Sequence, residues 1–198
     1  MRRFLAVLNL CFVLAFLNIC GAENRMIAFA DEPPAVLSSN FDTDAEGFIY
    51  FDDTFRSTNR PLYATGNYTT TGGDGGGGGL HVQLGGVDPR DITNGMSGGW
   101  SRDFSLGSDD TVEISFRYQV SMLGGYDQDE CSQVLVSVDG TRVNPGASDY
   151  VFEACGTGDG VPDQIFGWQQ ATVNVVLTAG THTLIVGGYN TKKTFTTE

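Results

Sequence analysis

Residues 111–120 read TVEISFRYQV, and this stretch decides the fold class. Apolar side chains at Val112, Ile114, Phe116 and Tyr118 alternate with polar ones through the whole stretch. Because successive side chains of a β-strand point to opposite faces, this alternation predicts a strand with one buried face and one solvent-facing side. The pattern is typical of an antiparallel sheet that packs a single face on a core.

Shorter stretches on both sides repeat the alternation, at residues 80–84, 134–138, 173–177 and 182–186. Asp139-Gly140 is a hairpin turn signal, and no stretch of useful length has a helical period. The sequence therefore predicts an all-β fold, a two-sheet antiparallel β-sandwich of jelly-roll type over residues 40–198. Because the chain reaches Glu198 soon after its last predicted strand, we expect the final strand of such a fold to be missing.

The N-terminus has the pattern of an export signal. Arg2 and Arg3 precede an apolar stretch at residues 4–19, and small residues follow up to Ala22. The stretch is shorter than the roughly 20 residues of a membrane span. We therefore expect a signal peptide at 1–22, a Pro-containing linker at 23–39, and a secreted or cell-surface protein with no membrane span after cleavage. An uncleaved signal anchor is the alternative.

The charge balance excludes one large class of partners. The net charge is −13, and from residue 23 onward 9 basic residues stand against 24 acidic ones, which gives −15. Such a chain repels phosphate backbones and anionic lipid heads, so nucleic acid is not an expected partner. An acidic surface suits divalent cations and neutral sugars, and it also simply keeps a protein in solution.

Cys131 and Cys155 are the cysteines that remain after removal of the predicted signal peptide. Two cysteines in an oxidising compartment indicate one disulfide, with two independent free thiols as the alternative.

Residues 42–47, DTDAEG, resemble the start of a calcium-binding loop. The candidate ligands are Asp42, Asp44 and Glu46, and Asp53 stands at the twelfth position of such a loop. Prolines on both sides exclude the flanking helices of a calcium hand, so a structural Ca²⁺ ion would be held by a turn at the base of the sandwich. The alternative is a turn in which the acidic side chains bond to the backbone.

A second acidic cluster comprises Asp127, Asp129 and Glu130. Clustered carboxylates attract a hard cation, although a solvated loop is the commoner outcome. Paired carboxylates also perform glycoside hydrolysis, which makes a polysaccharide-active enzyme one alternative function.

Tyr63, Tyr68 and Tyr126 are candidate ligand-binding residues, because they lie in loop-like stretches and aromatic rings stack on sugar faces. Trp100 and Trp168 begin predicted strands, where core packing competes with that role. Residues 95–99, GMSGG, match the G-x-S-x-G pattern of serine hydrolases, but a strand-like stretch follows where the motif needs a helix. We interpret Ser97 as part of a Gly-rich turn and assign no catalytic residue.

Several stretches together resemble jelly-roll modules of secreted multidomain proteins. They are Asn40-Phe41-Asp42 with Gly47-Phe48, residues 95–100, 129–130, 136–140, 179–184, 187–190 and 192–194. These stretches are similar to those of concanavalin A-like, carbohydrate-binding and MAM-like domains. The resemblance implies a two-sheet jelly roll, structural calcium near the first strand, and attachment to glycans or surfaces. Sugar-contacting residues in such modules are not fixed by motif, so the resemblance assigns none.

The leading hypothesis is a secreted, non-catalytic, lectin-like module that binds an extracellular glycan or cell-surface component. The alternatives are a structural adhesion domain with a protein partner and a polysaccharide-active enzyme.

Overall fold

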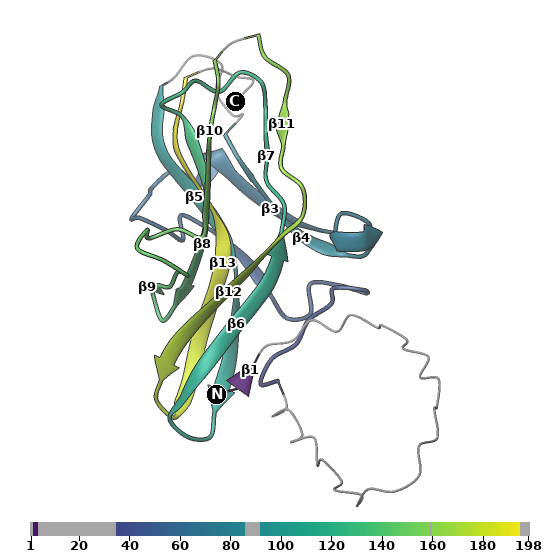
Figure 1. Cartoon of the computed structure of the whole chain (residues 1–198), viewed down its shortest axis with the longest axis vertical. Coiled ribbons are helices and arrows are strands. Elements are labelled where there is room, and N and C mark those ends of the chain that lie inside the picture. The colour runs from purple at the N-terminus through teal and green to yellow at the C-terminus, as the bar shows by residue number, and fades with distance from the viewer. Residues whose placement is uncertain (1, 4–34, 86–91, 159, 195–198) are drawn as a thin grey trace, which may run out of the picture.

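The computed structural model describes residues 2–3, 35–85, 92–158 and 160–194, and it is all-β over these residues (Figure 1). Thirteen strands are joined by loops and by two short 3₁₀ turns, Pro61–Tyr63 and Asp74–Gly76, with no α-helix among the described residues. The predicted fold class, an antiparallel β-sandwich, is confirmed. Residues 4–34, most of the predicted signal peptide and linker, lie outside the described residues.

The larger sheet contains six antiparallel strands in the order β10-β8-β13-β5-β2, with β9 paired to β8. Their bounds are β2 Ile49–Asp52, β5 Thr93–Leu106, β8 Cys131–Val138, β9 Thr141–Arg142, β10 Phe152–Cys155 and β13 Gly180–Lys193. The two longest, β5 and β13, pair from Gly180 opposite Leu106 to Lys193 opposite Thr93. This long central pair carries residues of both the core and the candidate site.

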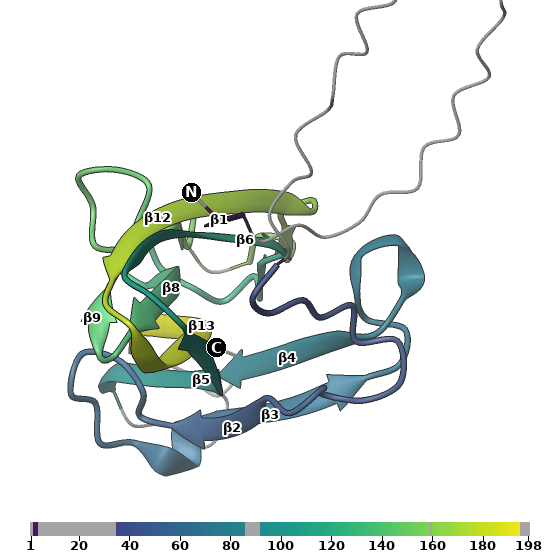
Figure 2. The same cartoon turned by 90° about the horizontal axis from the view of Figure 1, so that it is seen from below.

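Three smaller strand pairs complete the fold. β6 (Asp110–Tyr118) pairs with β12 (Gln169–Leu177) and forms the layer opposite β5, β13 and β8 (Figure 2). β3 (Ala64–Thr69) pairs with β4 (Gly79–Leu84), and β7 (Ser121–Met122) pairs with β11 (Gln164–Ile165). β1 (Arg2–Arg3) adds to β6 in parallel, and it lies inside the predicted signal peptide.

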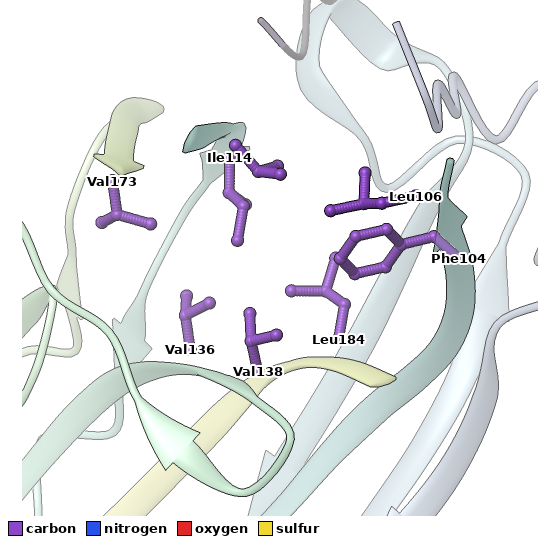
Figure 3. Close-up of a cluster of buried hydrophobic side chains, with 8 residues drawn as sticks. Phe104, Leu106, Ile114, Val136, Val138, Val173 and Leu184 are labelled. Atoms are coloured by element: carbon purple, nitrogen blue, oxygen red, sulfur yellow. The ribbon is translucent and has the colours of Figure 1, made fainter. Parts of the chain in front are cut away.

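The main core lies between the two layers (Figure 3). Its buried side chains come from five strands: Phe104, Leu106, Val112, Ile114, Val136, Val138, Val173 and Leu184. Val112 and Ile114 belong to the alternating stretch that predicted a half-buried strand, so that prediction is confirmed. Each fully buried aliphatic side chain contributes about 1.5–3 kcal/mol. Val36 and Leu37, assigned to the linker from sequence, also pack against this core.

A second, smaller cluster lies at the other end of the sheet and comprises Met122, Tyr126 and Ala154. Beside it, Cys131 and Cys155 face each other as partners in β8 and β10 and form the predicted disulfide. No helix in the described part of the chain is long and apolar enough to cross a membrane.

Tyr50 of β2 attaches the β3–β4 hairpin to the large sheet. Its ring fills space that glycines leave open: a Cβ at Gly66 would lie 2.0 Å from this ring, and one at Gly98 would lie 2.3 Å from its hydroxyl. Tyr50 also meets Trp100 edge to face, with ring centroids 5.6 Å apart, and burial raises the pKa of Tyr50. The Trp100 indole donates to the His81 carbonyl at 3.1 Å, so this tryptophan is packed in the core.

Candidate functional site

A polar hollow of about 380 Å³ lies where residues 56–60 approach β5 and β13. We call it the Arg56 pocket. β5 contributes Asn94 and Gly95, and β13 contributes Tyr189 and Thr191. Its volume falls in the range of about 300–1,000 Å³ that is usual for small-molecule sites. Gly95 has φ +70°, a backbone conformation that favours glycine, and a Cβ there would lie in ordinary contact with Thr58 and Tyr189.

Ser97 holds residues 53–60, which we call the pocket loop, against the large sheet. Its hydroxyl accepts the Phe55 amide at 3.0 Å, donates to the Phe55 carbonyl at 3.2 Å, and lies 2.7 Å from Thr58 Oγ1. The Ser97 carbonyl also accepts the Asp53 amide at 2.8 Å. Ser97 has no exposed surface and lies within β5, so the interpretation of residues 95–99 as a turn is wrong. At Gly98 and Gly99 the side chains of Tyr50 and Ile185 occupy the space that a Cβ atom would need, which explains glycine within this strand.

The backbone of the pocket loop contains three residues in the left-handed region. Asp53, Arg56 and Ser57 have φ of 54°, 56° and 54°, although none is glycine. Each such residue costs of order 1–3 kcal/mol and persists only where the surroundings determine it, which the bonds to Ser97 do here. Backbone strain of this kind clusters at functional sites, so the loop is a candidate for one.

Arg56 is fixed on three sides. Its guanidinium carbon lies 4.7 Å from the centroid of the Tyr189 ring, a cation–π contact. Its Nη2 donates to Gln133 Oε1 at 2.8 Å and to Asp149 Oδ1 at 2.7 Å. Asp149 also contacts Arg142 Nε at 3.1 Å, so one carboxylate serves two guanidinium groups.

Arg60 is held at its backbone and exposed at its side chain. Its amide donates to both carboxylate oxygens of Asp53, at 2.8 and 2.9 Å, and its Nη1 donates to the Asn59 carbonyl at 2.9 Å. Among the described residues, no carboxylate forms an ion pair with this guanidinium. The described pocket lining itself contains neither Asp nor Glu.

The first predicted metal site has the geometry of a turn. Asp42 Oδ2 accepts the Asn40 side-chain amide at 2.6 Å, Asp44 Oδ1 accepts the Glu46 amide at 2.6 Å, and Glu46 Oε1 accepts the Phe41 amide at 2.7 Å. The three carboxylates do not gather as one candidate ligand group in the described part of the chain. The geometry favours the backbone-bonded turn, the alternative that the sequence left open.

The second acidic cluster does bring its carboxylates together. Ligand oxygens of Asp127, Asp129 and Glu130 all lie within 4.8 Å of one another, the one such group in the described ranges. Asp129 Oδ2 accepts Lys192 Nζ at 2.8 Å, and this hydrogen bond lowers the pKa of Asp129. Glu130 is buried, and its Oε2 accepts the Asp127 amide at 2.8 Å. Carboxylate oxygens so placed could hold a hard cation, and calcium binding stays a prediction.

The three tyrosines chosen from sequence lie outside the Arg56 pocket. Tyr126 is only 4% exposed, and its hydroxyl accepts the Asn190 side-chain amide at 2.8 Å, so its ring is not available to stack on a sugar face. Its ring packs in the second core cluster, which a loop-like sequence does not reveal. Tyr68 and Tyr63 are half-buried: the Tyr68 hydroxyl donates to the Phe41 carbonyl, and the Tyr63 ring centroid lies 5.8 Å from Lys193 Nζ.

Sequence reasoning missed Tyr189, the aromatic residue that does line the pocket. The available signal was its register, since Tyr189 is out of phase with Leu184 and Val186 and so faces away from the main core. Together, the lining offers hydroxyl, amide and guanidinium groups and one aromatic face.

Comparison of the chain with protein-family models, curated proteins and solved structures found no match.

Proposed function

We propose that this chain is a secreted, non-catalytic, lectin-like module that binds extracellular carbohydrate in the Arg56 pocket. The observation that carries the proposal is the composition of the lining: side-chain hydrogen-bonding groups and the Tyr189 ring line one hollow of small-ligand size. Sugar hydroxyls both donate and accept hydrogen bonds, and the apolar face of a sugar ring packs on an aromatic ring. The lining supplies hydrogen-bonding partners for the hydroxyls, and its aromatic surface is the Tyr189 ring, which Arg56 also contacts.

Two further features support binding at this pocket. Glycoside hydrolysis needs a pair of carboxyl groups across the scissile bond, and the described lining has none, which favours binding over hydrolysis. The loop is also held in place by Ser97 and Asp53, so little ordering is needed when a ligand arrives. We also propose that the strands follow jelly-roll topology, that the signal peptide is cleaved after residue 22, and that the module carries structural calcium.

The test is retention of the exported full chain on a panel of immobilised polysaccharides, with calcium and with a chelator. We expect retention on one glycan class without release of sugar. Asn94→Ala removes an exposed pocket amide and should reduce retention, whereas Asn174→Ala, an exposed asparagine on β12, should not. Loss of retention in chelator would place an ion in or beside the site. A folded sample retained on no glycan contradicts the proposal.

An adhesion domain with a protein partner is the second candidate, and the edge strand β2 favours it. Ile49 and Phe51 are 61% and 51% exposed, and residues two apart in a strand share one face. This pair offers an apolar contact beside an open sheet edge. In this case Phe51→Ser would abolish attachment to a protein-coated surface and leave glycan retention unchanged.

A further inference from the structure

Resting on the proposed carbohydrate function, we infer that the Arg56 pocket takes a sugar that carries an anionic group, a carboxylate or a sulfate ester. Neutral sugars are the expectation from the net charge of the chain, which is −13. The local charges at this pocket have the opposite sign. Arg56 and Arg60 both line it, and no Asp or Glu does among the described residues.

The guanidinium groups at the pocket are incompletely paired with carboxylates in the described part of the chain. Asp149 is the acid that pairs with Arg56, at 2.7 Å, and it is shared with Arg142 at 3.1 Å. Arg60 has no ion-pair partner within the described ranges. Asp53, the acid nearest to it in the hydrogen-bond network, is bonded to the Arg60 backbone amide. Arg56 and Arg142 thus share one carboxylate, and the Arg60 guanidinium is left without an ion pair among the described residues.

The Arg56 guanidinium is also held in place for recognition. Arg56 is held by Tyr189, Gln133 and Asp149 through its ring contact and its Nη2, while its Nη1 makes no hydrogen bond to a described residue. A guanidinium is planar and always charged, and the Nη1 of Arg56 is the nitrogen that remains to donate to an oxygen of a carboxylate or sulfate. Little side-chain freedom of Arg56 remains to be lost when such a group binds.

The acidic remainder of the molecule limits what kind of anion can approach. Charges more than about 8 Å away are largely screened at physiological salt, whereas a contact pair persists. A densely charged anionic polymer contacts the two pocket arginines, but the many acidic groups of the chain repel the rest of it. The expected ligand is therefore an oligosaccharide with isolated anionic groups.

The experiment measures affinity of the exported full chain for oligosaccharides that contain a single uronic acid residue and for galactan oligosaccharides that carry a single sulfate ester. Each is compared with its own neutral counterpart, carboxyl-reduced or desulfated. We expect a member of one series to bind, and to lose about tenfold or more in affinity when its anionic group is removed. The series that binds identifies the anion as carboxylate or sulfate.

Arg60→Gln should reproduce the loss for the anionic ligand, because it removes the exposed charge while keeping an amide. Arg117→Gln is the matched control, since Arg117 is an exposed arginine on β6 that pairs with Asp74. Equal affinity for anionic and neutral counterparts, or no effect of Arg60→Gln, would overturn the inference. If a neutral glycan binds and Asn94→Ala weakens it, the carbohydrate function stands and the anionic preference fails. If no glycan of any kind binds, both fail.

Discussion

Nδ1 of His182 lies 2.7 Å from Oδ2 of Asp139, and Nε2 of the same ring lies 2.9 Å from the Thr178 carbonyl oxygen. Both partners are hydrogen-bond acceptors, so the protonated imidazole, with a hydrogen on each ring nitrogen, satisfies both contacts. The hydrogen bond to Asp139 raises the pKa of His182, and the same bond lowers the pKa of Asp139. This pair connects the turn after β8 to the start of β13.

The first prediction concerns stability against pH. A histidine with a raised pKa contributes stability that is fully present below its unfolded pKa of about 6.5. That contribution is lost as pH rises through the raised folded pKa of His182. We therefore expect the free energy of unfolding to fall with rising pH above about 6.5, measured by denaturant titration at a series of pH values. Asp139→Asn should weaken this dependence, and equal slopes in the two proteins would contradict it.

Ser97→Ala should destabilise the protein by about 1–3 kcal/mol, because the buried Phe55 amide loses its acceptor and Thr58 loses a partner. The same change should weaken glycan retention, since Ser97 positions the pocket loop. Thermal unfolding and retention are the two measurements. If Ser97 were a hydrolase nucleophile, the variant would instead lose a hydrolytic activity at unchanged stability.

The fold class was predictable because it depends on local patterns. Alternation through residues 111–120 identifies which side chains of β6 are buried without knowledge of what covers them. Cys131 and Cys155 were likewise predictable as a pair, since no other cysteine remains once the predicted signal peptide is removed. The acids at positions 42–46 were ambiguous, because a turn and a calcium loop use the same oxygens.

The candidate site was not predictable because it is assembled from distant segments. Arg56 meets Gln133, Asp149 and Tyr189 only after β5, β8 and β13 have paired. The prediction for Tyr126 fails for the same reason, because its burial depends on Asn190 and on strands before and after it in the chain. Side-chain periodicity predicts the face of a strand, but not what another segment places on that face.

Breaking the Cys131–Cys155 bond should destabilise the protein substantially. The cysteines are 24 residues apart in sequence, and closing a loop of that length is worth about 3 kcal/mol in the chain-entropy model. A Cys131→Ala/Cys155→Ala double variant should lower the free energy of unfolding by about this amount, measured in denaturant without reductant. Reductant should shift the unfolding midpoint of the unmodified protein and leave that of the double variant unchanged. A midpoint insensitive to both changes would contradict a stabilising role.

Two valines of β12 give an internal test of the sandwich. Val173 is 1% exposed and packs in the main core, whereas Val176 is 80% exposed. Val173→Ala removes two buried carbon atoms and should cost about 2 kcal/mol, because the surrounding side chains relax only partly into the space. Val176→Ala should change the free energy of unfolding by less than about 0.5 kcal/mol. Because the residue type, strand and substitution are the same, intrinsic strand propensity largely cancels in the comparison. Equal losses, measured by denaturant titration, would mean that β12 does not turn Val173 toward β5, β13 and β8.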